Sequence, residues 1–419
     1  MPMRPTFLPL WLWCALAAPL LLACGPLPCV GPNCETSNSS SGNAETSSSG
    51  TSMASSGVAT SSGGPASSAM GSSFVPSSSQ ESSSGGVVES SSASSVGSSS
   101  SSSTTGGPTL RYTLVIMPDT QNYLRPDNNE PGEDYAALYL AQTRWIADNA
   151  AAEKMAAVLH MGDLTFFNLA SEWALANTGL SMLDGVVRYI FALGNHDLSD
   201  NGFATDRTTL AETVLPVSRF IGQPGFGGVF EAGSMANSWH TLEADGDRYL
   251  VVVLEFAPRD EVLAWAANLA NSNQDRTVIL MMHDYLYWDD TRVGSPGRSY
   301  AFNQCDYQVG MLPNSSCNSG EDIWQGLVRN HPNIRFVFNG HHIEDGQGRL
   351  ISLNDAGNPV FQLLCNYQVR PIGGEGYLRL MRFWDDGRIT VEGYSPYLDR
   401  QLTDGANRFT IRLSPPAFE

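Results

Sequence analysis

A serine-rich run decides which part of this chain can fold. Between residues 35 and 108 about half of the residues are serine, and glycine and threonine supply many of the others. Such a segment buries too little apolar surface to offset the entropy that ordering would cost. We therefore expect residues 24–108 to be a disordered tether. Residues 109–419 form the expected folded domain, which is long enough for one substantial core.

The residues before the tether have the pattern of an export signal. Residues 1–23 contain one basic residue, Arg4, followed by an apolar run that ends in small residues. This pattern is typical of a secretory signal peptide and is too short for a stable membrane span. The sequence LLAC at 21–24 resembles the lipobox of bacterial lipoproteins, which implies lipidation of Cys24 and anchoring to the cell envelope, at the outer membrane where there is one. An ordinary cleaved signal with a spare cysteine is the alternative.

The expected domain is strongly acidic. Without the four acids of the tether and Arg4, it carries 38 acidic and 22 basic side chains, a net charge of −16. Such a surface repels polyphosphate backbones, which argues against nucleic acid as the main partner. Charge and composition do not indicate an oligomeric state.

Cysteine placement fits an oxidising compartment. Cys305 and Cys317 bracket an irregular loop, and we expect them to form a disulfide. Cys29 and Cys34 could pair at the base of the tether. Cys365 lies in an apolar run and is predicted to be buried as a small hydrophobic residue. None of the cysteines has zinc-finger spacing.

Strand and helix patterns alternate along the first two thirds of the domain. The predicted strands are 111–119, 155–163, 186–197, 276–284 and 333–340, with a hairpin at 237–256 and C-terminal strands at 349–353, 358–367, 376–384 and 388–396. The predicted helices are 135–154, 171–183, 258–272 and 321–331. This order predicts an α/β domain built from layers of sheet and helix.

Short polar clusters follow the predicted strands at their C-terminal ends. The clusters contain Asp119 and Gln121, Asp163, Asn195 and His196, His283, and His341. Ligand sites of open α/β sheets form at this edge. We therefore expect these side chains to converge on one site.

The order of the clusters resembles the calcineurin-like metallophosphoesterases. The motifs are MPDTQ at 117–121, GD at 162–163, GNHD at 194–197, MMHD at 281–284 and GHH at 340–342. The resemblance implies two central mixed β-sheets flanked by helices. It also implies hydrolysis of a phosphomonoester or phosphodiester of a small substrate, with one or two divalent metals (Mn, Fe or Zn) and metal-bound hydroxide as the nucleophile.

Matched residue by residue, the resemblance implies a set of metal ligands and a general acid. The ligands would be Asp119 and Gln121 for the first metal, Asn195, His283 and His341 for the second, and Asp163 as the bridge. His196 would protonate the leaving-group oxygen, with Asp197 as its orienting partner.

Two positions depart from the family pattern, and both weaken the first metal site. Gln121 stands where the family usually has histidine, and Ile343 stands where the second histidine of Gly-His-x-His belongs. A subset of the family shares the Asp-Thr-Gln first motif. The first site is expected to bind metal weakly, to fill only with substrate, or to stay empty. His342 is either a neighbour of the site, a substrate contact or a replacement for the ligand missing at Ile343.

Rival interpretations remain open at this level. Gln121 and Ile343 are also compatible with a degenerate, non-catalytic binding module on the same fold. A surface nuclease is a second alternative, although the acidic charge counts against it. A purple acid phosphatase would need tyrosine at position 166, where this chain has Phe166, so no tyrosinate colour is expected.

Overall fold

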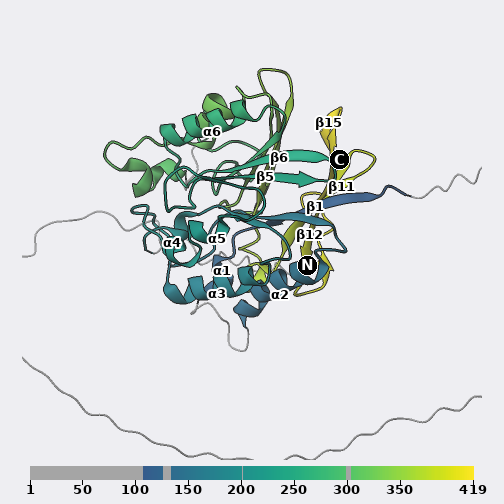
Figure 1. Cartoon of the computed structure of the whole chain (residues 1–419), viewed down its shortest axis with the longest axis horizontal. Helices are drawn as coiled ribbons and strands as arrows, with labels where there is room; N and C mark the ends of the chain where they lie inside the picture. Colours follow the sequence, from purple (N-terminus) through teal and green to yellow (C-terminus); the bar gives the residue numbers. More distant parts are fainter. Residues whose placement is uncertain (1–106, 126–133, 201, 299–302) are drawn as a thin grey trace, which may run out of the picture. The chain divides into compact units, whose positions relative to one another are not determined.

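The computed structural model describes residues 107–125, 134–200, 202–298 and 303–419. The predicted signal peptide, Cys24, the possible Cys29–Cys34 pair and the tether up to residue 106 lie outside the described residues. The described residues fold into two mixed β-sheets with helices on their outer faces, as predicted (Figure 1).

The first sheet has a parallel half and an antiparallel half. Its order is β15-β14-β12-β11-β1-β2-β3, with β13 paired to β12. Its strands are β1 (Leu110–Met117), β2 (Met155–His160), β3 (Tyr189–Phe191), β11 (Leu378–Trp384), β12 (Arg388–Ser395), β13 (Arg400–Gln401), β14 (Arg408–Leu413) and β15 (Pro416–Phe418). Because β1, β2 and β3 run parallel, their C-terminal ends lie at one edge of the sheet.

The second sheet also has a parallel centre. Its order is β4-β5-β6-β7-β8-β10-β9. Its strands are β4 (Phe226–Val229), β5 (Ser238–Ala244), β6 (Asp247–Val253), β7 (Thr277–Met281), β8 (Ile334–Asn339), β9 (Gln347–Leu353) and β10 (Pro359–Cys365). Strands β6, β7, β8 and β10 run parallel, so the segments that follow β7, β8 and β10 leave the sheet at the same edge.

The helices are mostly short. They are α1 (Gln121–Leu124), α2 (Tyr135–Asn149), α3 (Ala170–Ser181), α4 (Ala211–Val214), α5 (Val217–Phe220), α6 (Asp260–Ser272), α7 (Gly320–Ile323) and α8 (Pro371–Gly374), with 3-10 turns η2 (Asn195–Asp197), η3 (Gln304–Asp306) and η4 (Gln308–Met311) and a π-helical turn η5 (Trp324–Val328). Helices α2 and α3 lie on one side of the molecule and α6 on the other (Figure 1). Among the described residues, none of the helices has the length and apolar character needed to cross a bilayer.

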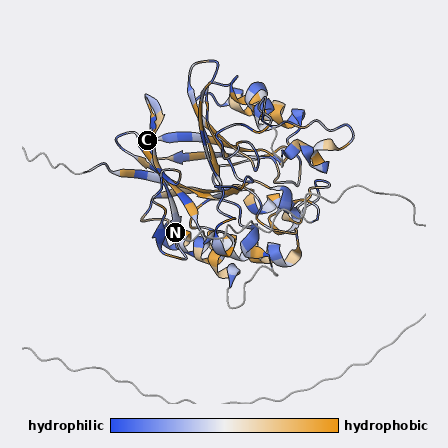
Figure 2. Cartoon of the chain, turned by 180° about the vertical axis from the view of Figure 1, so that it is seen from behind, coloured by the Kyte–Doolittle hydropathy of each residue, from blue (hydrophilic) through white to orange (hydrophobic). Residues whose placement is uncertain are grey.

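Alternation along the strands separates three apolar layers. Val251 on β6 is buried between the two sheets, whereas its neighbour Val252 packs with Val262 of α6 on the outer face. In the first sheet, Val115 faces outward and packs with Trp173 of α3. Figure 2 shows hydrophobic and hydrophilic stretches on the strands and on the helices. The successive side chains of a strand point to opposite faces, so one strand serves two cores.

Several predicted boundaries are wrong, for local reasons. The strand predicted at 186–197 is only β3, because the chain turns after it and Asn195–Asp197 form η2. The helix predicted at 321–331 is the short α7 continued by η5, and it ends at Val328. Strands β4, β13, β14 and β15 were not predicted. The Cys305–Cys317 disulfide is confirmed, with an S–S distance of 2.05 Å, and Cys365 is free and buried.

Candidate metal centre

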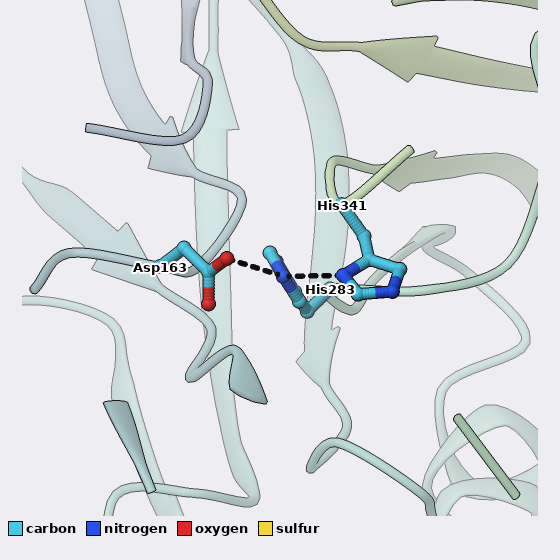
Figure 3. A group of neighbouring side chains, drawn as sticks. All are labelled: Asp163, His283 and His341. Carbon is cyan, nitrogen blue, oxygen red and sulfur yellow. Dashed lines mark hydrogen bonds and ion pairs between the residues drawn. The ribbon is translucent and has the colours of Figure 1, made fainter. Parts of the chain in front are cut away.

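The two sheets bring their polar strand ends together, as the motif order predicted. Asp163 follows β2 of the first sheet, while His283 and His341 follow β7 and β8 of the second. His283 Nε2 lies 3.1 Å from Asp163 Oδ2 and 3.2 Å from His341 Nδ1. Figure 3 shows Asp163 and His341 on opposite sides of the His283 ring. One potential ligand atom from each of these residues lies within 4.8 Å of the others.

Tight backbone turns aim these side chains at one another. Asp163 and His341 adopt positive φ angles of +48° and +71°. Such left-handed conformations are unfavourable for residues with a Cβ and concentrate at functional sites. Gly194 and Gly340 allow the close approach, since a Cβ at either position would come within 2.1 Å of a carboxylate oxygen of Asp163 or Asp119, respectively.

The tautomer of His283 is set by the backbone. Its Nδ1 lies 2.8 Å from the carbonyl oxygen of Met161, which can only accept a hydrogen bond. Nδ1 therefore carries the proton, and Nε2 faces Asp163 and His341. A histidine that donates one ring N–H to a carbonyl and presents its other nitrogen is the usual arrangement of a metal ligand.

Asn195 contributes a buried oxygen that lacks a hydrogen bond. Its side-chain Nδ2 donates to the carbonyl of Gly202 at 2.7 Å, whereas its Oδ1 has no hydrogen-bond partner among the described residues. A buried, unsatisfied acceptor is costly unless a ligand completes it. One carboxylate, two imidazoles and an amide oxygen are the kinds of ligand that suit Mn, Fe or Zn.

Burial and mutual charge shift the pKa values of the central groups. Burial would raise the pKa of Asp163, but the charge and the hydrogen bond of His283 hold it below its usual range. Burial would lower the pKa of His283, but Asp163 raises it to about 10 in the metal-free protein. Burial lowers the pKa of His341 to about 3, so this ring is neutral near pH 7 and can offer a lone pair.

Asp119 and Gln121 lie beside Asp163 in a network of carboxamides. Gln121 Nε2 donates to Asp163 Oδ2 at 3.1 Å and to Gln368 Oε1 at 2.6 Å. Asp119 accepts hydrogen bonds from the His341 backbone N–H at 3.1 Å and from Asn366 Nδ2 at 2.9 Å. Burial raises the pKa of Asp119 to about 8. Asn366 and Gln368 were not predicted as site residues, because no histidine or carboxylate follows β10 to indicate a metal site there.

His196 is oriented by a carbonyl group, which corrects the predicted role of Asp197. His196 Nδ1 lies 2.7 Å from the Phe166 carbonyl oxygen, while the backbone N–H of His196 donates to Asp163 Oδ1 at 2.9 Å. The Asp197 carboxylate instead accepts from the backbone N–H groups of Gly194, Leu164 and Thr165 and from the Thr165 hydroxyl. Asp197 thus ties together the loops that follow β2 and β3.

His342 has a partner of its own, away from Asp163. Its Nε2 lies 2.7 Å from Asp284 Oδ1, and both side chains are buried. Asp284 Oδ2 also accepts the backbone N–H of Gln304 at 2.9 Å. Asp284, His341 and His342 form a second group that could hold a metal by proximity alone. Both oxygens of Asp284 take part in these contacts.

Comparison with known proteins identifies the family of this chain. The family model for calcineurin-like phosphoesterases matches residues 113–345, more than half of the chain. The chain belongs to the calcineurin-like phosphoesterases. This family uses divalent metals, and Asp163, His283 and His341 of this chain form a candidate metal site.

Individual relatives are more distant. The phosphoesterase is 28% identical over 299 residues to the protein YvnB of Bacillus subtilis (strain 168), which corresponds to 68% of this chain and 20% of YvnB. The chain therefore spans about one fifth of that relative's length. Among solved structures, it is similar to a purple acid phosphatase from yellow lupin seeds (TM-score 0.43, 14% identity, 72% of this chain and 53% of that one). It is also similar to a dimetal phosphatase from Danio rerio (TM-score 0.42, 13% identity, 73% of this chain and all of that one).

Proposed function

We propose that this phosphoesterase hydrolyses a small phosphomonoester or phosphodiester outside the cytoplasm, with Asp163, Asn195, His283 and His341 as ligands of a divalent metal. The observation that carries the proposal is the His283 ring, whose Nδ1–H is held by a carbonyl and whose Nε2 faces Asp163 and His341. A metal held there supplies charge neutralisation on the phosphoryl oxygens and a water of lowered pKa.

The protein's own groups set the geometry around that metal. Asp163 is fixed from two sides, since its Oδ1 accepts the His196 backbone N–H and its Oδ2 faces His283. Asn195 is held by its bond to Gly202, so its free oxygen needs no reorganisation to bind a cation. Rigid ligands of this kind lower the reorganisation that catalysis would otherwise require.

His196 is the proposed general acid. Its Nδ1–H donates to the Phe166 carbonyl, which leaves Nε2 to hold the proton that passes to the leaving-group oxygen. The side chain is only partly buried, so a substrate can reach it. The Phe166 ring lies 4.7 Å from the His196 ring, and Gly202 also packs against the imidazole, since a Cβ at this position would come within 2.4 Å of Cε1. The imidazole is therefore clamped in one orientation.

The proposed location is the cell envelope, with a lipid on Cys24 and residues 24–108 as the tether. Support comes from the LLAC sequence at 21–24 and from the serine-rich composition. A Cys24→Ala variant is expected to leave the membrane fraction, and mass spectrometry of the wild-type N-terminal peptide is expected to detect the acyl groups. An unmodified Cys24 in the mature protein would contradict the anchor.

The catalytic proposal is tested by substituting two buried histidines, His283 after β7 in the metal centre and His331 before β8. His283→Ala is expected to lose both bound metal and hydrolysis of p-nitrophenyl phosphate and bis(p-nitrophenyl) phosphate. The matched control is His331→Ala, because His331 is buried but precedes β8, whereas the metal centre follows it. Hydrolysis that survives in His283→Ala would reject the site.

The binding-module alternative makes the opposite prediction for the wild-type protein. A degenerate module would hold no metal after purification and would turn over neither ester when Mn, Fe or Zn is added. A nuclease would instead degrade DNA faster than the small esters. The three-way outcome separates these activities in one set of assays.

A further inference from the structure

We propose that a carboxamide cluster formed by Gln121, Asn366 and Gln368 takes the place of the first metal, so that each chain binds a single metal ion. The inference rests on the proposed function only in that the remaining ion is the one beside His283. It resolves what the departures at Gln121 and Ile343 mean for the site.

The cluster already satisfies the two carboxylates that a first metal would neutralise. Gln121 Nε2 donates to Asp163 Oδ2 at 3.1 Å. Asp119 Oδ2 accepts from Asn366 Nδ2 at 2.9 Å and from Gln368 Nε2 at 3.5 Å. A carboxamide NH2 group presents partial positive charge and has no lone pair to give a metal. An amide NH2 group thus faces each of the two carboxylates.

The orientation of these amides follows from the backbone. Asn366 Oδ1 accepts the backbone N–H of Gln368 at 2.9 Å, so Nδ2 must be the atom that faces Asp119. Gln121 Nε2 lies between two oxygens, one from Asp163 and one from Gln368, and reversing this amide would place oxygen against oxygen. The network therefore selects nitrogen, and not oxygen, as the atom facing each carboxylate.

Asp119 has too few potential ligands around it to hold a first metal. Asp119 belongs to neither group of three histidine, cysteine or carboxylate side chains that the described residues place within metal-binding distance. Gln121 Oε1 is buried without a partner among the described residues, as Asn195 Oδ1 is, but the Asn195 side also has the group of Asp163, His283 and His341. On the Asp119 side Gln121 Oε1 would add only one neutral oxygen, which is a weaker ligand than an imidazole. Position 343 is isoleucine, which offers no donor. His342 Nε2 faces Asp284 at 2.7 Å, and its near group of potential ligands is Asp284 and His341, without Asp119.

Metal stoichiometry tests the proposal directly. The purified full-length protein, equilibrated with excess MnCl2 and then passed through a desalting column, is expected to retain one Mn per chain by elemental analysis. Gln121→Glu exchanges the central NH2 for a carboxylate oxygen of the same shape and is expected to retain two. The matched control is Gln362→Glu, a buried glutamine on β10 whose oxygen accepts from Arg292, and it is expected to retain one.

Each outcome separates this inference from the proposed function, because hydrolysis is measured on the same samples. Two Mn per wild-type chain with hydrolysis would overturn the single-metal inference and leave the function standing. One Mn per chain without hydrolysis would overturn the proposed function and leave the single-metal inference standing. A protein that retains no Mn would overturn the inference and the function. A Gln121→Glu protein that is folded by circular dichroism and still holds one Mn would also contradict the role of the cluster.

Discussion

Two sides of one carboxylate differ in chemistry although their geometry is alike. Asp163 Oδ2 lies 3.1 Å from His283 Nε2 and 3.1 Å from Gln121 Nε2. The imidazole nitrogen can lose its proton and bind a metal, whereas the carboxamide nitrogen is always a donor. The two nitrogens lie at the same distance from Asp163 Oδ2. The type of residue that carries the nitrogen, histidine or glutamine, therefore determines whether the neighbouring space attracts or excludes a cation.

The largest effect is expected from a change of Asp163, the carboxylate that both His283 and Gln121 contact. Asp163→Asn is expected to lower kcat by more than about a thousandfold, because the metal loses its charged ligand. The bound metal should be lost in parallel, which elemental analysis measures. A variant that keeps its metal and most of its activity would show that Asp163 is not part of the centre.

Removing the proposed acid is expected to have the next largest effect. His196→Ala should lower kcat by about 10²–10⁴-fold while the metal content stays unchanged. The loss should be larger for an alkyl phosphate than for a p-nitrophenyl ester, because nitrophenolate leaves without protonation. Equal losses for both leaving groups would argue against proton donation by His196.

The His283 side of the comparison predicts a pH dependence. In the metal-free protein the pKa of His283 is raised to about 10, so the charged pair with Asp163 stabilises the fold below pH 6.5 and is lost as the pH rises toward 10. Metal must displace that proton, so its affinity should rise about tenfold per pH unit between pH 7 and 9. Calorimetric titration in buffers of different ionisation enthalpy should detect release of about one proton. Binding that is independent of pH in this range would contradict the shift.

The smallest expected effect comes from the amide side. Gln368→Leu replaces the glutamine with an apolar side chain of similar size and removes its hydrogen bonds. A neutral hydrogen bond is worth about 0.5–1.5 kcal/mol, so kcat/KM should fall by about two- to tenfold. The metal content should not change. A loss as large as that of Asp163→Asn would show that Gln368 does more than support Asp119.

The sequence predicted one part of this centre better than the other. Asp163, His283 and His341 were found because each follows a strongly apolar strand and belongs to a residue type that binds metal. Asn366 and Gln368 follow a strand of the same kind, but asparagine and glutamine are also ordinary turn residues. Their role depends on β10 lying next to β8 in the sheet, and strand order cannot be read from local pattern.

Hydrogen-bond partners were also beyond the reach of the sequence. Asp197 follows His196 in the chain, which suggested a pair, but their side chains point to different partners because η2 turns the backbone between them. The orienting group is the Phe166 carbonyl, and a backbone atom carries no sequence signature. For the same reason the Met161 carbonyl, which fixes the tautomer of His283, could not be predicted.

The central claim is that the catalytic centre binds one metal ion, on the His283 side of Asp163. Its most direct test is to titrate metal into chelator-treated protein and to measure the initial rate of bis(p-nitrophenyl) phosphate hydrolysis. The chelated protein should be inactive, and the rate should rise linearly with Mn and level off at one equivalent per chain. A rate that chelation leaves unchanged would contradict metal-dependent hydrolysis. A plateau at two equivalents would contradict the difference between the two sides of Asp163.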